Sequence, residues 1–158
     1  GLAASKPLVI SVAAGLRVAD LARMLGADLP IVRSMPNRPA LTGAGATGLY
    51  APPSVGSEAR QRAAGILGVS GTVVWVDDES AMDVVTALSG SGPAYFFLLA
   101  ETLAAAAVAQ GLDPDAAQRL AAATLHGAGT MAAEDSDVAG MREAVTSKGG
   151  TTEAALPE

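Results

Sequence analysis

The 158-residue chain has no cysteine and a single histidine, His126. These absences exclude a disulfide scaffold, a thiol nucleophile and a Cys/His zinc site, and they leave no obvious Ser-His triad. Aromatic residues make up only 3% of the chain, although 50% of it is hydrophobic. This composition indicates a folded protein whose core is built largely from small side chains.

Basic residues are also scarce: the chain has ten of them and sixteen acidic residues, which gives a net charge of -6. No basic stripe is interleaved with aromatics, so we expect no nucleic-acid partner. The two apolar runs at 94–100 and 103–109 are separated by Glu101 and Thr102. We therefore expect no membrane span, and no secretory signal is evident. Because the chain begins with Gly1 and ends at Leu156-Pro157-Glu158, just after a helix begins, we expect it to be a fragment.

The first half of the chain alternates between strand and helix patterns. Residues 7–12 form a continuous apolar run, which is typical of a strand covered on both faces of a parallel sheet. An apolar stripe at helical spacing follows from Val18 to Leu25 and stops at Gly26. Further strands are predicted over 30–35, 46–51 and 71–76, with a Pro/Gly-rich loop over 36–45 and a helix after Ser54 or Ser57.

The second half of the chain loses all strand-like alternation from Asp77 onward. Helices are predicted over 80–88, 93–110, 114–133 and 138–146, with another beginning at Thr151. The triplet Asp113-Pro114-Asp115 is typical of a helix start. We therefore expect an α/β segment over 1–76 followed by an all-α segment over 77–158.

The helix that begins at Pro93 is apolar almost all the way round, and only Glu101, Thr102 and Gln110 interrupt it. A helix of this kind is buried by other helices rather than lying on a surface. A helical segment of about eighty residues is half an ordinary domain and offers little cover of its own. The pattern therefore predicts a homodimer.

Two segments follow predicted strands and have two readings each. Ser11-Val12-Ala13-Ala14-Gly15 lies at the carboxyl end of a strand, where open α/β sheets bind ligands, and its small residues would let a flat ligand approach. The same residues are also common in tight strand-to-helix turns. In Arg33-Ser34-Met35-Pro36-Asn37, the amide of Asn37 can bind a polar ring or another amide. Pro36 and Asn37 also favour turns for purely structural reasons.

A third segment, Val145 to Thr152, joins the end of one helix to the start of the next. Free N–H groups at a helix N-terminus, with hydroxyls beside them, suit a carboxylate or phosphate. The alternative is a hinge in which Thr151 or Thr152 merely caps the next helix. His126 is expected to be structural, because no titratable partner lies at helical spacing, and Glu101 is expected to be a hydrogen-bonded structural carboxylate rather than a functional acid.

Three motifs carry a resemblance to a known family: Met35-Pro36-Asn37, the stretch Thr86-Ala87-Leu88-Ser89-Gly90-Ser91-Gly92-Pro93-Ala94-Tyr95-Phe96, and residues 145–152. In this order and spacing the chain resembles pyrroline-5-carboxylate reductase, over essentially its whole length. The resemblance implies the second half of a Rossmann-type parallel sheet and a helical dimerisation domain. It also implies a cytoplasmic enzyme that transfers hydride from NADPH or NADH to the C=N bond of 1-pyrroline-5-carboxylate, giving L-proline.

The resemblance also assigns residues to roles. Ala13, Ala14 and Gly15 would lie along the cofactor, with Met35, Pro36 and Asn37 near its nicotinamide end. Ser147, Gly149, Gly150, Thr151 and Thr152 match the family's substrate loop, in which N–H groups hold the carboxylate and the Thr152 hydroxyl approaches the ring nitrogen. The loop of one subunit is expected to face a cofactor held by the other subunit.

The sequence departs from the family in two ways. Lys148 stands where the family usually has proline, and no Gly-x-Gly-x-x-Gly turn follows a first strand, so the pyrophosphate and ribose sites are expected to lie outside this chain. One alternative is therefore a non-catalytic truncated reductase that acts as a helical dimerisation module. A second alternative is a related Rossmann reductase for a hydroxy acid or another imine. Those enzymes rely on a lysine or histidine acid in the helical domain, whereas Lys148, the only lysine after Lys6, lies in a predicted loop.

Overall fold

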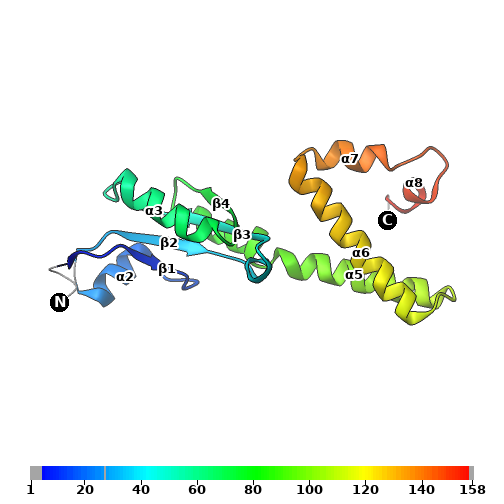
Figure 1. Ribbon diagram of the computed structural model, residues 1–158, viewed down its shortest axis with the longest axis horizontal. Coiled ribbons are helices and arrows are strands. Elements are labelled where there is room, and N and C mark those ends of the chain that lie inside the picture. The colour runs from blue at the N-terminus through cyan, green and yellow to red at the C-terminus, as the bar shows by residue number, and fades with distance from the viewer. Residues whose placement is uncertain (1–4, 27, 157–158) are drawn as a thin grey trace. The chain divides into compact units, whose positions relative to one another are not determined.

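The computed structural model describes residues 5–26 and 28–156 (Figure 1). Gly1, Pro157 and Glu158, on which the expectation of a fragment rests, lie outside these residues. The chain divides into two compact units, Gly1–Tyr95 and Phe96–Glu158. In chain order the elements are β1 Val9–Ser11, α2 Val18–Leu25, β2 Ile31–Met35, the 3₁₀ helix η1 Arg38–Thr42, β3 Gly45–Tyr50, α3 Ser57–Gly68, β4 Gly71–Trp75, α4 Ala81–Val85, the π-helical turn η2 Thr86–Gly90, α5 Gly92–Ala109, α6 Pro114–Glu134, α7 Val138–Ala144 and α8 Thr151–Ala155.

The four strands form one sheet in the order β1-β2-β3-β4. The pairs β1/β2 and β3/β4 are parallel, as predicted, but β2 and β3 pair antiparallel. A parallel connection needs a crossover of about a dozen residues or more, usually through a helix, and the 36–44 segment holds only the short η1. The α/β class followed by helices is therefore confirmed, with one strand direction that differs from the expected parallel sheet.

Helices cover both faces of this sheet. Ile31 packs with Leu21 of α2 in one buried cluster, whereas its neighbour Val32 packs with Ala63 of α3 in another. Because adjacent strand residues point to opposite faces, α2 and α3 lie on opposite sides of β2. The continuous burial of residues 31–34 shows that β2 is covered on both faces, whereas β1, for which this cover was predicted, is only half-buried at Val9–Ser11.

The helix α3 begins differently from the prediction. Its N-cap is Gly56, with no side-chain cap bond, so neither Ser54 nor Ser57 caps it. Arg60 holds the loop before it instead, because its guanidinium donates to the carbonyls of Ala51, Pro52 and Val55 and stacks over the Trp75 ring at 5.0 Å. This arginine therefore fastens the end of β3 to α3 and β4.

The first compact unit extends past the last strand. A Cβ built on Gly48 of β3 would clash with the side chain of Val85 in α4, so glycine allows α4 to pack directly on the sheet. The predicted boundary between residues 76 and 77 marks where strands give way to helices and stays a prediction of domain organisation. By packing, α4 and η2 belong with the sheet.

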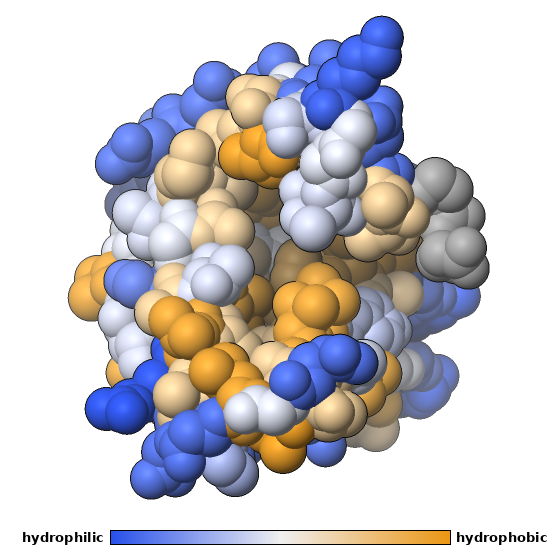
Figure 2. All heavy atoms as spheres, turned by 90° about the vertical axis from the view of Figure 1, so that its right-hand side faces the viewer, coloured by the Kyte–Doolittle hydropathy of each residue, from blue (hydrophilic) through white to orange (hydrophobic). Residues whose placement is uncertain are grey.

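The second unit is entirely helical in its described part, which confirms the predicted helices within a few residues. Asp113 caps α6 as predicted, since its carboxylate accepts from the Ala116 N–H at 3.0 Å. Large apolar side chains of α5 remain uncovered in the single chain, and Phe96, Phe97 and Leu103 are each more than half exposed. Figure 2 shows one face of the molecule, on which hydrophobic residues (orange) are exposed at the surface.

One helix is long and apolar enough to cross a membrane, which the sequence interpretation did not expect. Within the described residues, α4, η2 and α5 form a 29-residue helix over 81–109 that is long and apolar enough to cross a membrane. The sequence interpretation divided this segment at Glu101 and treated its halves separately. One such helix is weak evidence, because a helix that packs against other helices has the same composition.

Candidate functional site

The first group of predicted site residues lies at one edge of the sheet in the first unit. Because β1 and β2 are parallel, both strands run in the same direction, and β1 ends at Ser11 beside Arg33. The strand β2 continues for two more residues, paired with β3, and ends at Met35. The Ser34 hydroxyl donates to the Ser11 carbonyl at 2.9 Å and joins the two strand ends. Both predicted segments therefore follow strands that end toward the same side of the sheet, and their role in cofactor binding stays a prediction.

The turn itself is open and small. Ala13, Ala14 and Gly15 are exposed, and the Ala13 N–H donates to the Ser11 hydroxyl at 3.3 Å. Gly15 has φ of 77°, a left-handed conformation that favours glycine, and nothing lies within 4 Å of a Cβ built there. The residues present thus leave room for a flat cofactor against the backbone.

The Asn37 side chain makes two hydrogen bonds that stabilise the fold. Its Oδ1 accepts from the Ala46 N–H at 2.9 Å, and its Nδ2 donates to the Ser89 carbonyl at 3.1 Å. The half-buried side chain therefore ties the end of β2 to β3 and η2. An amide carries a second N–H and a second lone pair, so a role in ligand binding is compatible with these bonds.

One motif escaped the sequence analysis. Residues 43–48, Gly-Ala-Gly-Ala-Thr-Gly, have the spacing of a dinucleotide-binding turn. They lead from η1 into β3 rather than from a strand into a helix, so they lack the required context. A Cβ on Gly45 would meet the Ser70 carbonyl at 2.7 Å, which shows that this glycine is needed for packing.

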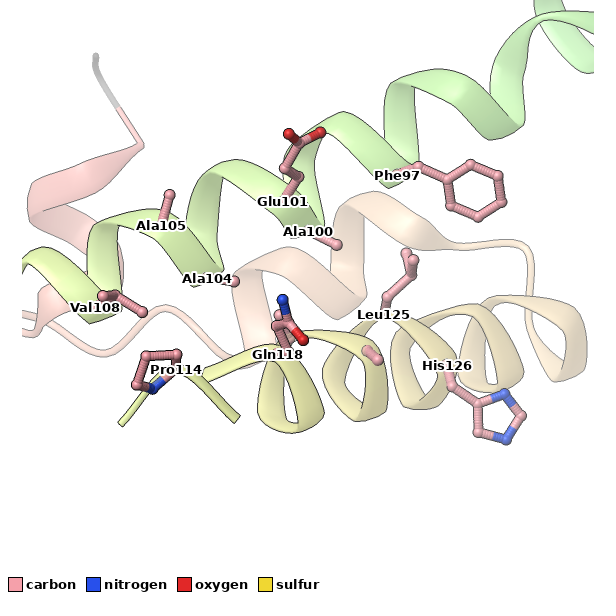
Figure 3. A pocket seen from close by; sticks show the side chains of 12 residues that line it. Phe97, Ala100, Glu101, Ala104, Ala105, Val108, Pro114, Gln118, Leu125 and His126 are labelled. Atoms are coloured by element: carbon pink, nitrogen blue, oxygen red, sulfur yellow. The ribbon is translucent and has the colours of Figure 1, made fainter. Parts of the chain in front are cut away.

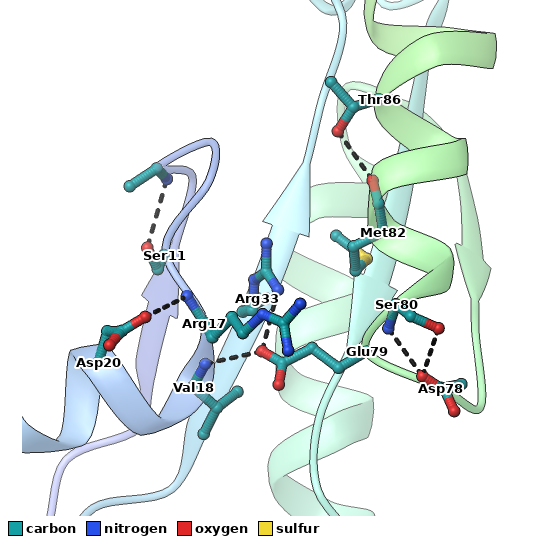
Figure 4. Close-up of polar contacts among 11 residues, drawn as sticks. Ser11, Arg17, Val18, Asp20, Arg33, Asp78, Glu79, Ser80, Met82 and Thr86 are labelled. Atoms are coloured by element: carbon teal, nitrogen blue, oxygen red, sulfur yellow. Dashed lines mark hydrogen bonds and ion pairs between the residues drawn. The ribbon is translucent and has the colours of Figure 1, made fainter.

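An ion pair that the sequence did not predict lies beneath this edge (Figure 4). The Glu79 Oε1 accepts from the Arg33 guanidinium at 2.9 Å and from the Val18 N–H at 2.7 Å. Arg33 is buried, and Glu79 occupies the N-terminus of α2, where an anion would otherwise bind. No charge pattern along the chain links these residues, because they are 46 positions apart.

The second group of predicted residues lies in the loop before α8 in the second unit. Ser147 to Gly150 form a turn closed by the Gly150 N–H on the Ser147 carbonyl at 3.0 Å, and Gly150 is the N-cap of α8. A Cβ on Gly150 would meet the Ser147 hydroxyl at 2.5 Å. The glycine therefore lets this hydroxyl lie close to the start of the helix.

A carboxylate already occupies part of this loop. The Gly149 N–H donates to the Glu153 Oε2 at 2.6 Å, and Gly149 has φ of 73°. This N–H is therefore accessible to a carboxylate oxygen, and an incoming anion would have to displace the Glu153 side chain. Thr151 and Thr152 form the first turn of α8, and Thr152 is half-buried.

A groove of about 600 Å³ separates α5 from α6 in the second unit. Figure 3 shows the Gln118 and Leu125 side chains pointing into it, whereas the Glu101 carboxylate and the His126 ring point away. Glu101 is exposed in the single chain and its carboxylate makes no hydrogen bond within the described residues, so the expectation of a hydrogen-bonded structural carboxylate is not met there. His126 is exposed as well, and no group of three or more metal-ligating residues occurs in the described part.

Comparison with known proteins identifies relatives of the chain. Residues 79–158 match the family described as pyrroline-5-carboxylate reductase dimerisation. The pyrroline-5-carboxylate reductase of Pseudomonas aeruginosa is 46% identical over 150 residues, which cover 94% of this chain and 55% of that protein. The Haemophilus influenzae enzyme is 45% identical over 154 residues, covering 96% and 57%. The chain thus spans little more than half the length of these relatives.

Solved structures agree with the sequence relatives. A pyrroline-5-carboxylate reductase from Coxiella burnetii superimposes with a TM-score of 0.90 at 44% identity, covering 96% of this chain and 57% of that one. A Plasmodium falciparum pyrroline carboxylate reductase with NADP bound gives a TM-score of 0.83 at 34% identity, covering 97% and 62%. The likeness therefore extends over both units.

Proposed function

The chain belongs to the pyrroline-5-carboxylate reductase family, and we propose that it takes part in reducing the C=N bond of 1-pyrroline-5-carboxylate to give L-proline. NADPH or NADH supplies the hydride when bound. The observation that carries the proposal is the parallel pairing of β1 with β2, because the open turn 13–15 and residues 35–37 follow the carboxyl ends of these two strands. The Plasmodium falciparum relative was solved with NADP bound, which favours the phosphorylated cofactor.

Binding of the dinucleotide at this edge is assigned to Ala13, Ala14 and Gly15, with Met35, Pro36 and Asn37 toward the nicotinamide. The small exposed side chains of the turn would let the ring lie against the backbone. The α2 N-terminus holds the Glu79 carboxylate, so we assign no pyrophosphate contact to it. The anionic part of the cofactor would therefore be held by other residues.

Binding of the substrate carboxylate is assigned to the loop Ser147, Gly149, Gly150, Thr151 and Thr152. The Gly149 N–H, which holds Glu153 in the free chain, would donate to the substrate instead. The Thr152 hydroxyl would donate a hydrogen bond to the imine nitrogen as hydride reaches the adjacent carbon. Reduction leaves this nitrogen as an amine, so a proton must reach it in the same reaction, either through this hydroxyl or from water.

A homodimer is part of the proposal. The apolar face of α5 is uncovered in the single chain, and the matched family is described by dimerisation. A second copy of the chain would bury Phe96, Phe97 and Leu103 without any new segment. The same contact would give the 81–109 helix a protein environment instead of a lipid one.

The test is NADPH oxidation in the presence of 1-pyrroline-5-carboxylate by wild type and by Thr152→Ala. Loss of one hydrogen bond to the transition state should lower kcat/KM by about tenfold to a hundredfold. The control is Thr130→Ala, because the Thr130 hydroxyl only bonds back to the His126 carbonyl on the exposed helix α6. Full activity in Thr152→Ala contradicts its role, and a dimer without turnover on any imine favours the non-catalytic dimerisation module.

A further inference from the structure

The serine- and glycine-rich motif over 86–96 has no role in the proposed function so far. It forms η2 and the start of α5, and η2 is a π-helical turn closed by the Ser91 N–H on the Thr86 carbonyl at 2.9 Å. Such wide turns within helices often lie at functional sites. Here the turn contacts the segment that we assign to the nicotinamide end of the cofactor.

The contact arises from a missing donor. In a regular helix the Ser89 carbonyl would accept from the N–H four residues later, but that residue is Pro93, which has none. The N–H of the next residue, Ala94, donates to the Ser91 carbonyl at 3.0 Å. The Ser89 carbonyl is instead paired with the Nδ2 of Asn37 at 3.1 Å.

The pairing fixes the orientation of the Asn37 amide. Its Oδ1 must face the Ala46 N–H, which can only donate, and its Nδ2 must face the Ser89 carbonyl, which can only accept. A flipped amide would place two donors together on one side and two acceptors on the other. Within the described residues, the second N–H of the Asn37 amide makes no hydrogen bond, and β3 and η2 set the direction in which it points.

Glycine at position 90 belongs to the same contact. A Cβ there would meet the terminal methyl of Met35 at 2.9 Å, so η2 lies directly against the Met35 side chain as well as against Asn37. By contrast, nothing lies within 4 Å of a Cβ built on Gly92, two residues further on. The close approach is therefore local to the turn and not a property of the whole segment.

We infer that Pro93 is a positioning residue: by leaving the Ser89 carbonyl without a helical donor, it locks Asn37 so that one amide N–H faces the bound dinucleotide. This inference rests on the proposed function, because it takes the ligand to be a nicotinamide dinucleotide. Asn37 touches the ligand, and Pro93 acts only through Ser89 and Asn37.

The experiment follows the Asn37 side-chain amide directly. Asn37 is the only asparagine in the sequence, so [15N]asparagine labelling gives one side-chain NH₂ pair in the NMR spectrum. In wild type, one proton should exchange slowly because it bonds to Ser89, and the other should shift as NADPH is titrated. In Pro93→Ala the new N–H competes for the Ser89 carbonyl, so the slow proton should be lost and NADPH affinity should fall about tenfold. Gly92→Ala, the control at the same junction, should keep both signals.

An unchanged amide pair in Pro93→Ala, or a second proton that does not move at saturating NADPH, overturns the inference. If Pro93→Ala does not fold, Asn37→Asp retains the acceptor for Ala46 but has no donor, and unaltered NADPH affinity in it overturns the inference equally. A wild type that binds NADPH without reducing the imine contradicts the proposed reaction alone. A wild type that does not bind NADPH overturns the inference, because the inference requires this ligand.

Discussion

The two compact units bury their apolar side chains to very different degrees. In the first unit, Ile31, Val32 and Leu49 are at most 1% exposed, and helices cover both faces of the sheet. In the described part of the second unit, Ala117 is the only buried hydrophobic residue, while Phe96 and Phe97 are more than half exposed. The first unit therefore carries its own core, whereas the second leaves large apolar side chains uncovered in the single chain, which is where the proposed homodimer would bury them.

The largest effect is expected from breaking that partner surface. Leu103→Glu places a charge on the uncovered face of α5, where Leu103 is 53% exposed in the single chain. In a symmetric dimer the change occurs twice, so the loss of about 1.5–3 kcal/mol for each leucine weakens association by at least a hundredfold. Sedimentation velocity should show monomers.

The matched control for this variant is Leu41→Glu, because Leu41 lies in η1 of the first unit and is 83% exposed. It adds the same charge to an exposed leucine outside the helical unit. A dimer that survives Leu103→Glu, or one that dissociates equally in both variants, would contradict the comparison.

The next effect concerns the core of the first unit. Leu49→Ala removes a fully buried side chain that packs in the cluster with Val32 and Ala63, and should lower the free energy of unfolding by about 2–5 kcal/mol. The dimer dissociation constant should not change, because this core contributes nothing to the partner surface. Chemical denaturation measures the first quantity, and Leu41→Ala should leave it within about 0.5 kcal/mol of wild type.

Ion pairs provide a smaller version of the same contrast. Glu79→Gln removes the charge that faces buried Arg33, and should cost about 1–3 kcal/mol, since the amide can still accept from the Val18 N–H. Glu143→Gln affects a pair with Arg142 at 3.8 Å in which both side chains are more than half exposed, and should be nearly neutral. Equal losses in thermal or chemical unfolding would contradict this assignment.

The smallest effect involves Asp78, whose carboxylate accepts from the Ser80 hydroxyl and N–H, each at 2.7 Å (Figure 4). These bonds, led by the hydroxyl and helped by the Arg17 charge, lower the pKa of Asp78 below its usual value. The associated stability is present above the unfolded-state pKa and is lost as pH falls through the lowered folded-state pKa. Ser80→Ala should raise the pKa of Asp78 in an NMR titration, and an unchanged value would contradict the assigned cause.

Much of the fold could be predicted from local patterns. Helix and strand segments follow from apolar spacing, and the Asp113 cap follows from a short motif whose partner lies three residues away. The antiparallel direction of β2 and β3 follows from the short connection between them, because it has no crossover helix. The sequence predicts this connection as a loop over 36–45, but the strand direction was not inferred from it. The Arg33–Glu79 pair depends on tertiary packing, because no periodicity joins residues so far apart in the chain.

For the candidate site, the sequence predicts the segments but not the contacts that hold them. Strand ends and a Gly-Gly-Thr-Thr loop are visible in sequence, and the structure places the first group at one edge. The double engagement of Asn37 could not be predicted, because its partners Ala46 and Ser89 come from separate elements. The absent N–H of Pro93 was a usable signal, since a proline four residues after Ser89 frees that carbonyl in any helix.

Hydrogen–deuterium exchange of α5 at two protein concentrations tests the difference between the units most directly. On dilution from a dimeric to a monomeric sample, amides of residues 96–109 should lose protection, whereas those of β2 and β3 should keep theirs. Protection of 96–109 that is equal to that of β2 and independent of concentration would show that the helical unit needs no second copy, and would contradict the account.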